Sequence, residues 1–373
     1  MVCLGVLLAG VYWFTYSGNL LASDEIMLFD AVESLARRGD MRLNLAANFR
    51  VIQYFPVEER LPMPAVDAEP MQVLAASALF ALAEAVPGVG LLHTVWLLNV
   101  LVCAAGGPLF FLYARSLGYC ERVAITGSLI YGLGTITWPY SKTFFREPLA
   151  MVLLFGAALC LNAWRERRGC PYRWGWLAGF FSLYLLALLT KEAALLSIPV
   201  FLALAAPDLR QTGGRRLIRA VALAVVMIIA GFLVLNAILA IAPIPRSYNP
   251  IARLEAVSGK AEFIGYALLS YLFSPGRSLF AFSPVLLLGV PGVAWLIRGR
   301  RWREALIPAL AVAAFMGGYA VIRHETWFGG LSWGPRYLVP VTPLALLAVL
   351  PVLQAAARAE VARWVRWGVV VVI

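Results

Sequence analysis

Long apolar runs separated by short polar segments make up most of the 373-residue chain. Runs of this kind predict membrane-spanning helices, because a helix needs roughly 20 apolar residues to cross the hydrocarbon core. We expect about eleven such helices, near residues 2–16, 91–114, 123–140, 145–163, 174–190, 191–207, 217–242, 279–297, 305–322, 337–355 and 361–373. The first and last runs are short for a span, so we expect both ends to be trimmed, as in a fragment or in a gene predicted too short.

Composition supports an all-α, polytopic membrane protein. The chain is 62% hydrophobic and only 14% charged, with a mean hydropathy of +0.81, and a soluble protein of this size has no room to bury so much apolar surface. The net charge of +11 would fit a nucleic-acid partner if it were spread over one face. Instead, the arginines gather in short segments between the apolar runs, and we expect no nucleic-acid partner.

The arginine distribution also predicts sidedness. Basic residues outnumber acidic ones by 17 to 5 in five connecting segments, against 14 to 15 in the rest of the chain. These segments are 115–122, 165–173, 208–219, 298–304 and 358–366. An excess of arginine marks cytoplasmic loops, so we expect these five segments inside and the alternate loops outside.

This sidedness requires that Pro70–Val86 does not span. That segment is weakly hydrophobic and carries Gln72 and Glu84, so we interpret it as an interfacial helix; a true span there would reverse every later loop. The amphipathic stretch Ile26–Leu35 predicts a second helix in the same outer segment, 17–90. We therefore divide the chain into a transmembrane module (1–242), an outer loop (243–277) and a C-terminal transmembrane module (278–373).

Asp24 and Glu25 lie shortly after the first apolar run, on its predicted outer side. Ionised groups near hydrocarbon are costly, which makes two adjacent carboxylates there functional candidates. They fit a general base and an orienting carboxylate beside it. The alternative is an ordinary helix N-terminus, where acidic residues are favoured by the helix dipole.

A second group of candidates lies in the predicted outer turn Trp138–Pro148. Lys142, Arg146 and Glu147 place two cations and a carboxylate in this turn, where they are candidates for substrate binding. The alternative is a helix cap within an interfacial belt of aromatic residues.

Lys191 interrupts a long apolar stretch together with Glu192. A lysine at membrane depth is a functional candidate, and a phosphate is a natural counter-ion for it. The alternative is a Lys–Glu pair that closes a turn between helices.

The segment Arg323–Tyr337 combines glycines, tryptophans and arginines. Trp327 and Trp333 are candidates for stacking on a sugar, and Arg336 for binding a phosphate. The alternative is an aromatic belt with a turn. Ser274-Pro275-Gly276-Arg277 is a weaker version of the same pattern, which adds Arg277 as a phosphate-binding candidate.

We expect neither a histidine or thiolate metal site nor a disulfide, and the sequence leaves a requirement for a divalent metal open. The two histidines, His93 and His324, are too far apart in the sequence for a histidine metal site. The five cysteines form no CxxC pair and lie outside the predicted outer loops. No cofactor is expected.

Taken together, these residues resemble GT-C glycosyltransferases that use polyprenyl-phosphate sugars, in the branch of protein O-mannosyltransferases and aminoarabinose transferases. The matching parts are Asp24-Glu25 with the stretch Ala31–Asp40, the turn Tyr140–Pro148 and Thr190-Lys191-Glu192. The order of spans and outer loops also matches. Two departures are a less acidic second loop and Glu69-Pro70-Met71 in place of a Pro-Pro-Leu-like element.

The resemblance implies a membrane enzyme, a glycosyltransferase that moves a sugar from a polyprenyl phosphate to an acceptor hydroxyl by inverting displacement. Asp24 would be the catalytic aspartate, Glu25 its neighbour, Glu147 a second acidic position and Lys191 a donor-phosphate contact. The acceptor would be a lipid, glycan or protein, and the enzyme a multi-pass protein of the inner (plasma) membrane with an extracytoplasmic active site.

Two alternatives come from other classes of protein. A transporter or lipid flippase is expected to carry charges or broken helices near the membrane midplane. Here Asn236 is a polar interruption, whereas the charges concentrate at helix ends, which favours the enzyme. The other alternative is a non-catalytic GT-C relative that acts as an assembly partner.

Overall fold

Helices account for every regular element in the described part of the chain. The computed structural model describes residues 1–20, 22–43, 69–167, 172–206, 261–323, 326–330 and 332–358. Five helical segments there are long and apolar enough to cross a membrane: α5 (Leu91–Ser116), α8 (Glu147–Glu166), α9 (Arg173–Thr190), α16 (Trp302–Ile322) and Arg336–Ala357. The prediction of an all-α polytopic membrane protein is confirmed.

Shorter helices pack beside these five: α1 (Val2–Phe14), α6 (Glu121–Leu133), α10 (Ile198–Ala205), α13 (Ala261–Phe273) and α15 (Gly289–Arg298). The predicted spans 217–242 and 361–373 lie outside the described residues, as do residues 243–260 of the second outer loop.

Several predicted spans are broken into shorter pieces. The span 123–140 consists of α6 and a separate turn of helix, α7 (Thr137–Tyr140), and 191–207 consists of η2 (Glu192–Ser197) and α10. The span 279–297 consists of α14 (Leu279–Phe282), η3 (Pro284–Leu288) and α15, and 337–355 lies within η4 (Arg336–Val341), α17 (Thr342–Leu346), η5 (Leu347–Val349) and α18 (Leu350–Ala357). Prolines occur within or at the start of most of these pieces. Because proline lacks an N–H donor, it favours such interruptions and the 3₁₀ turns that bridge them.

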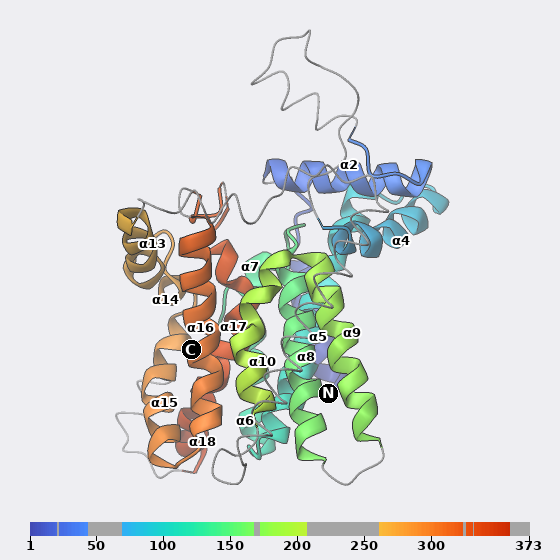
Figure 1. The fold of residues 1–373 in the computed structure, drawn as a ribbon. Coiled ribbons are helices and arrows are strands. Elements are labelled where there is room, and N and C mark those ends of the chain that lie inside the picture. The colour runs from blue at the N-terminus through green and yellow to red at the C-terminus, as the bar shows by residue number, and fades with distance from the viewer. Residues whose placement is uncertain are drawn as a thin grey trace.

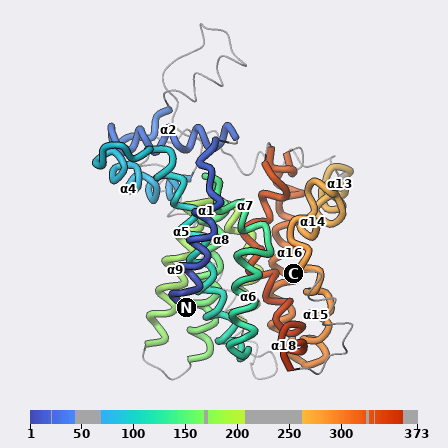
Figure 2. Tube along the Cα trace, turned by 180° about the vertical axis from the view of Figure 1, so that it is seen from behind, coloured from blue at the N-terminus to red at the C-terminus, as the bar shows by residue number. Residues whose placement is uncertain are grey.

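Two helices lie across one end of the bundle rather than along it. They are α2 (Ser23–Arg38) and α4 (Met71–Ala85), and both views show them at this end (Figures 1 and 2). The position of α4 agrees with the predicted interfacial helix at Pro70–Val86. Apolar side chains of the two helices share a core with α5 and the turn before α8: Leu28, Ala31, Val32, Val73, Ala76, Phe80, Val95, Trp96 and Phe144.

The connections of the bundle separate by charge. The arginine-carrying ends of α5, α8 and α15, and the arginine-carrying starts of α6, α9 and α16, lie at the end away from α2 and α4 (Figure 1). The turn before α8, the end of α9 and the start of η4 lie at the end near α2. The chain thus brings segments that are far apart in sequence together beneath the interfacial helices.

Candidate functional site

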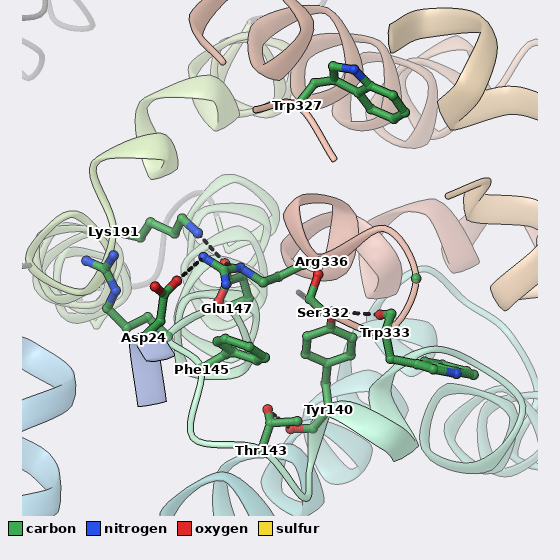
Figure 3. A network of polar contacts seen from close by, with 12 residues as sticks. Asp24, Tyr140, Thr143, Phe145, Glu147, Lys191, Trp327, Ser332, Trp333 and Arg336 are labelled. Carbon is green, nitrogen blue, oxygen red and sulfur yellow. Dashed lines mark hydrogen bonds and ion pairs between the residues drawn. The ribbon is translucent and has the colours of Figure 1, made fainter. Parts of the chain in front are cut away.

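Four charged side chains lie close together beneath α2: Asp24, Glu147, Lys191 and Arg336 (Figure 3). Arg336 contacts both carboxylates. Nη2 of Arg336 lies 2.8 Å from Oδ2 of Asp24, and Nε of Arg336 donates to Oε1 of Glu147 at 2.9 Å. Nζ of Lys191 donates to the same Glu147 oxygen. The cluster therefore pairs two carboxylates with two cations.

Helix ends hold these groups in place. Asp24 lies in the first turn of α2, and Glu147 is the first residue of α8, directly before a proline. Both carboxylates therefore lie where the helix dipole favours negative charge. Lys191 is the C-terminal cap of α9, where the same dipole favours a cation, and Arg336 begins η4.

Burial separates Asp24 from the other three groups. The side chains of Glu147, Lys191 and Arg336 are 1%, 8% and 9% exposed, whereas that of Asp24 is 38% exposed. Buried charges are tolerated when they are paired and hydrogen-bonded, as these are. Asp24 is thus the carboxylate that solvent or a ligand can reach, with a cation already beside it.

Aromatic rings flank the two cations. The guanidinium carbon of Arg336 lies 4.4 Å from the ring centroid of Phe145, and Nζ of Lys191 lies 4.9 Å from that of Tyr337. A cation over an aromatic face is attracted by the electron-rich ring, so both contacts favour the charged forms of these side chains.

A second ion pair lies next to the first and was not expected from the sequence. Arg146 pairs with Glu69, whose Oε1 also accepts a hydrogen bond of 2.6 Å from the backbone N–H of Glu192. Glu69 thereby links the neighbours of Glu147 and Lys191. The sequence signal for this pair is an acidic residue directly before a predicted interfacial helix.

Glu25 lies beside Asp24 in sequence but is fully buried. Its Oε1 accepts from the backbone N–H of Phe144 at 2.8 Å, and its Oε2 accepts from that of Ala22 at 3.1 Å. Its carboxylate thus contacts the backbone of the turn before α8.

The predicted residues outside the cluster have other contacts. Nζ of Lys142 lies 5.4 Å from the ring centroid of Trp138. The ring of Trp327 packs edge-on against that of Tyr271, with centroids 5.4 Å apart. Trp327 lies apart from the charged groups (Figure 3). Trp333 is 56% exposed, and its backbone carbonyl accepts from the hydroxyl of Tyr140 at 2.8 Å.

Arg277 braces the loop that carries Trp333. Its guanidinium donates to the backbone carbonyls of Gly330 at 3.0 Å, Ser332 at 2.9 Å and Gly334 at 2.7 Å. It also contacts Oγ of Ser332 at 3.2 Å. This arrangement fixes the loop before η4 and hence the start of the segment that carries Arg336.

Within the described ranges, no group of three or more His, Cys, Asp or Glu side chains is arranged to hold a metal ion. The cluster presents two cationic and two anionic side chains to a ligand. Two cations are suited to an anionic ligand such as a phosphate, and the exposed carboxylate is suited to accepting a proton.

The sequence matches no protein-family profile and no curated protein. Among solved structures, the chain is similar to the crystal structure of ArnT from Cupriavidus metallidurans bound to undecaprenyl phosphate. The TM-score is 0.58 at 16% sequence identity, over 99% of this chain and 62% of that chain. The chain therefore has a GT-C-like fold, and it spans about three fifths of the length of that transferase.

Proposed function

We propose that the chain is a membrane glycosyltransferase that transfers a sugar from a polyprenyl-phosphate donor to an acceptor hydroxyl with inversion. The likeness to ArnT supports this proposal, because that protein was crystallised with undecaprenyl phosphate. The observation that carries the proposal is the contact of Arg336 with both Asp24 and the buried Glu147–Lys191 pair. A partly exposed carboxylate beside two cations combines a base with a site for an anionic leaving group.

Each group has a distinct part in the proposed reaction. The acceptor oxygen attacks the anomeric carbon of the sugar while the bond from that carbon to the donor phosphate oxygen breaks. The acceptor proton passes to the carboxylate of Asp24. The bonding electrons leave with the lipid phosphate, and Lys191 and Arg336 balance the charge that develops there. Glu147 holds the two cations in position.

No general acid is needed, because a phosphate is a good leaving group without protonation. One base and two cations therefore suffice for a single displacement. A hydrolase of the two-carboxylate type uses a carboxylic acid to protonate the leaving oxygen, whereas Glu147 is held here between two cations.

The remaining sequence candidates take supporting roles in this proposal. Arg146 and Glu25 support the turn that carries Glu147, and Arg277 shapes the loop that carries Trp333. Lys142, Trp327 and Trp333 are proposed contacts for the sugar or the acceptor, which is a lipid, glycan or protein. The proposed site faces the outside of the inner membrane, because the arginine loops lie at the opposite end of the bundle.

The test is transfer by the purified chain in lipid nanodiscs, supplied with a panel of polyprenyl-phosphate sugars and mixed lipid and glycan acceptors. Release of polyprenyl phosphate with sugar transfer is expected, and Asp24→Asn is expected to lower transfer by ~10²–10⁴-fold. Asp40→Asn is the matched control, because Asp40 is a second carboxylate near α2 that pairs with Arg38 instead. Binding of donors without release, in wild-type protein, would contradict the enzyme and favour a flippase or a non-catalytic relative.

A further inference from the structure

The backbone of residues 143–145, just before α8, runs through the protein without regular structure. All three residues are buried. Backbone N–H and C=O groups in apolar surroundings need partners within the protein, because water is not available to them. The identity of these partners shows what fixes the segment.

Asn99 of α5 supplies two of them. Its Nδ2 donates to the backbone carbonyl of Thr143 at 2.8 Å and to that of Phe145 at 2.8 Å. Asn99 is fully buried. Gln72 of α4, also fully buried, donates from Nε2 to Oδ1 of Asn99 at 3.4 Å. One amide thus holds both ends of the segment while a second amide supports it.

Glu25 of α2 supplies a third partner, since its carboxylate accepts from the N–H of Phe144 at 2.8 Å. The ring of Phe144 also stacks on Trp96 of α5, with centroids 4.7 Å apart and an interplanar angle of 26°. The segment is therefore held from α2 and α5, with α4 behind, by polar contacts and ring packing together.

We propose that Asn99, with Glu25 and Gln72, forms a clamp that positions the charged cluster through residues 143–145. Phe145 lies against Arg336, and Glu147 begins α8 two residues further along (Figure 3). A shift of the segment therefore moves the carboxylate that holds Lys191 and Arg336. In this role Asn99 is a positioning residue, and the interfacial helices α2 and α4 become part of the site's framework.

This inference rests on the proposed function for its effect on transfer, but its geometric part is testable without activity. The chain contains three lysines, Lys142, Lys191 and Lys260, so modification of one of them is readily followed by mass spectrometry. Lys191 is buried against Glu147, which protects it from amine-reactive reagents. Protection of Lys191 therefore reports whether Glu147 is in place.

The experiment measures the rate of acetylation of Lys191 by acetic anhydride in the full chain in nanodiscs, with Lys260 as internal reference. Asn99→Asp keeps the size of the side chain but replaces the donor with a carboxylate facing two carbonyl oxygens. The rate of acetylation of Lys191 is expected to rise about 10-fold. This rise corresponds to a decrease of about 1.4 kcal/mol in the free energy of local opening. Sugar transfer is expected to fall about 100-fold, the scale of a misplacement near 1 Å.

Asn162→Asp is the matched control, because Asn162 is a buried amide near the opposite end of α8 that donates to Glu166. It makes the same chemical change far from residues 143–145 and is expected to leave Lys191 protected. Glu25→Gln is a milder test of the clamp, since its amide oxygen can still accept from Phe144, and a smaller rise is expected.

Unchanged protection of Lys191 in folded Asn99→Asp protein would overturn the clamp, as would an equal rise in Asn162→Asp. If Asn99→Asp does not fold, Glu25→Gln decides the question in the same way. Selective loss of Lys191 protection without any sugar transfer by the wild-type chain would support the clamp and refute the transferase proposal.

Discussion

Arg336 and Asp24 form an ion pair with an Nη2–Oδ2 distance of 2.8 Å, although they lie near opposite ends of the described chain. The pair joins the interfacial helix α2 to the last described helical segment, η4 to α18. Because the same guanidinium also contacts Glu147 at the start of α8, three distant parts of the sequence depend on one side chain. Substitutions in this cluster are therefore interpretable only when activity and stability are measured together.

Replacement of Asp24 by Asn tests the base. Asparagine keeps the size of the side chain but takes no proton at neutral pH, so transfer is expected to fall by ~10²–10⁴-fold. Binding of polyprenyl phosphate is expected to change little, since Lys191 and Arg336 hold the phosphate. Stability is expected to change by less than about 1 kcal/mol, because the Asp24 end of the ion pair is partly exposed. Transfer assays and thermal unfolding measure the two effects.

The helix-cap alternative makes the opposite prediction for this variant. Asparagine supports a helix N-terminus as well as aspartate does, so a purely capping Asp24 would leave transfer unchanged. Normal transfer by Asp24→Asn protein would end the catalytic proposal for this residue.

Replacement of Lys191 tests the phosphate contact. Lys191→Ala is expected to weaken polyprenyl-phosphate binding by about 10-fold or more, since a hydrogen bond to a charged group contributes roughly 1.5–3 kcal/mol. Lys191→Arg is expected to restore binding only partly, because a planar guanidinium and an ammonium differ in geometry. The fold is expected to hold, because Glu147 keeps its contact with Arg336. Binding measured by isothermal titration and unfolding by differential scanning fluorimetry separate the two roles.

Glu192→Ala is the control for Lys191, since its backbone N–H, rather than its side chain, is bonded to Glu69. Aggregation of both Lys191→Ala and Glu192→Ala would support the structural alternative, in which the two side chains only close the turn after α9.

Much of the fold could be predicted because apolar length and arginine placement are properties of the sequence alone. The interruptions were harder to predict. Apolar residues continue through Gly134 and Ser283, so hydropathy does not register the ends of α6 and α14 there. Tertiary packing decides whether such a residue is accommodated within a helix or ends it.

All four residues of the cluster could be predicted from the sequence, because charges at membrane depth are rare and therefore conspicuous. Their contacts could not be predicted. Arg277 and Arg336 are both arginines near outer loops, yet one binds backbone carbonyls and the other carboxylates. Glu69 was missed as a partner of Arg146 because ion pairs between distant segments leave no local pattern. The roles proposed for individual site residues remain predictions.

Arg277→Lys is expected to destabilise the protein without removing positive charge. A lysine ammonium cannot reproduce the fork that reaches the carbonyls of Gly330, Ser332 and Gly334. A loss of about 1.5–3 kcal/mol is expected for hydrogen bonds from a charged group, seen as a lower melting temperature. Donor affinity is expected to change less than in Lys191→Ala. A large loss of affinity at unchanged melting temperature would instead support a direct phosphate contact.

Sidedness is tested by single cysteines in a chain from which the native cysteines have been removed. Ser17 lies just before α2, and Gly299 follows α15 at the other end of the bundle; both are exposed. Gly299 has a φ of −75°, which any residue can adopt. The arginine-rich connections predict that an impermeant maleimide added to intact cells labels Ser17→Cys, and that Gly299→Cys is labelled only after the membrane is opened. Labelling of Gly299→Cys from outside would reverse the sidedness. The cluster would then face the cytoplasm, where nucleotide sugars are available, and the argument for a lipid-linked donor on the outer face would fail.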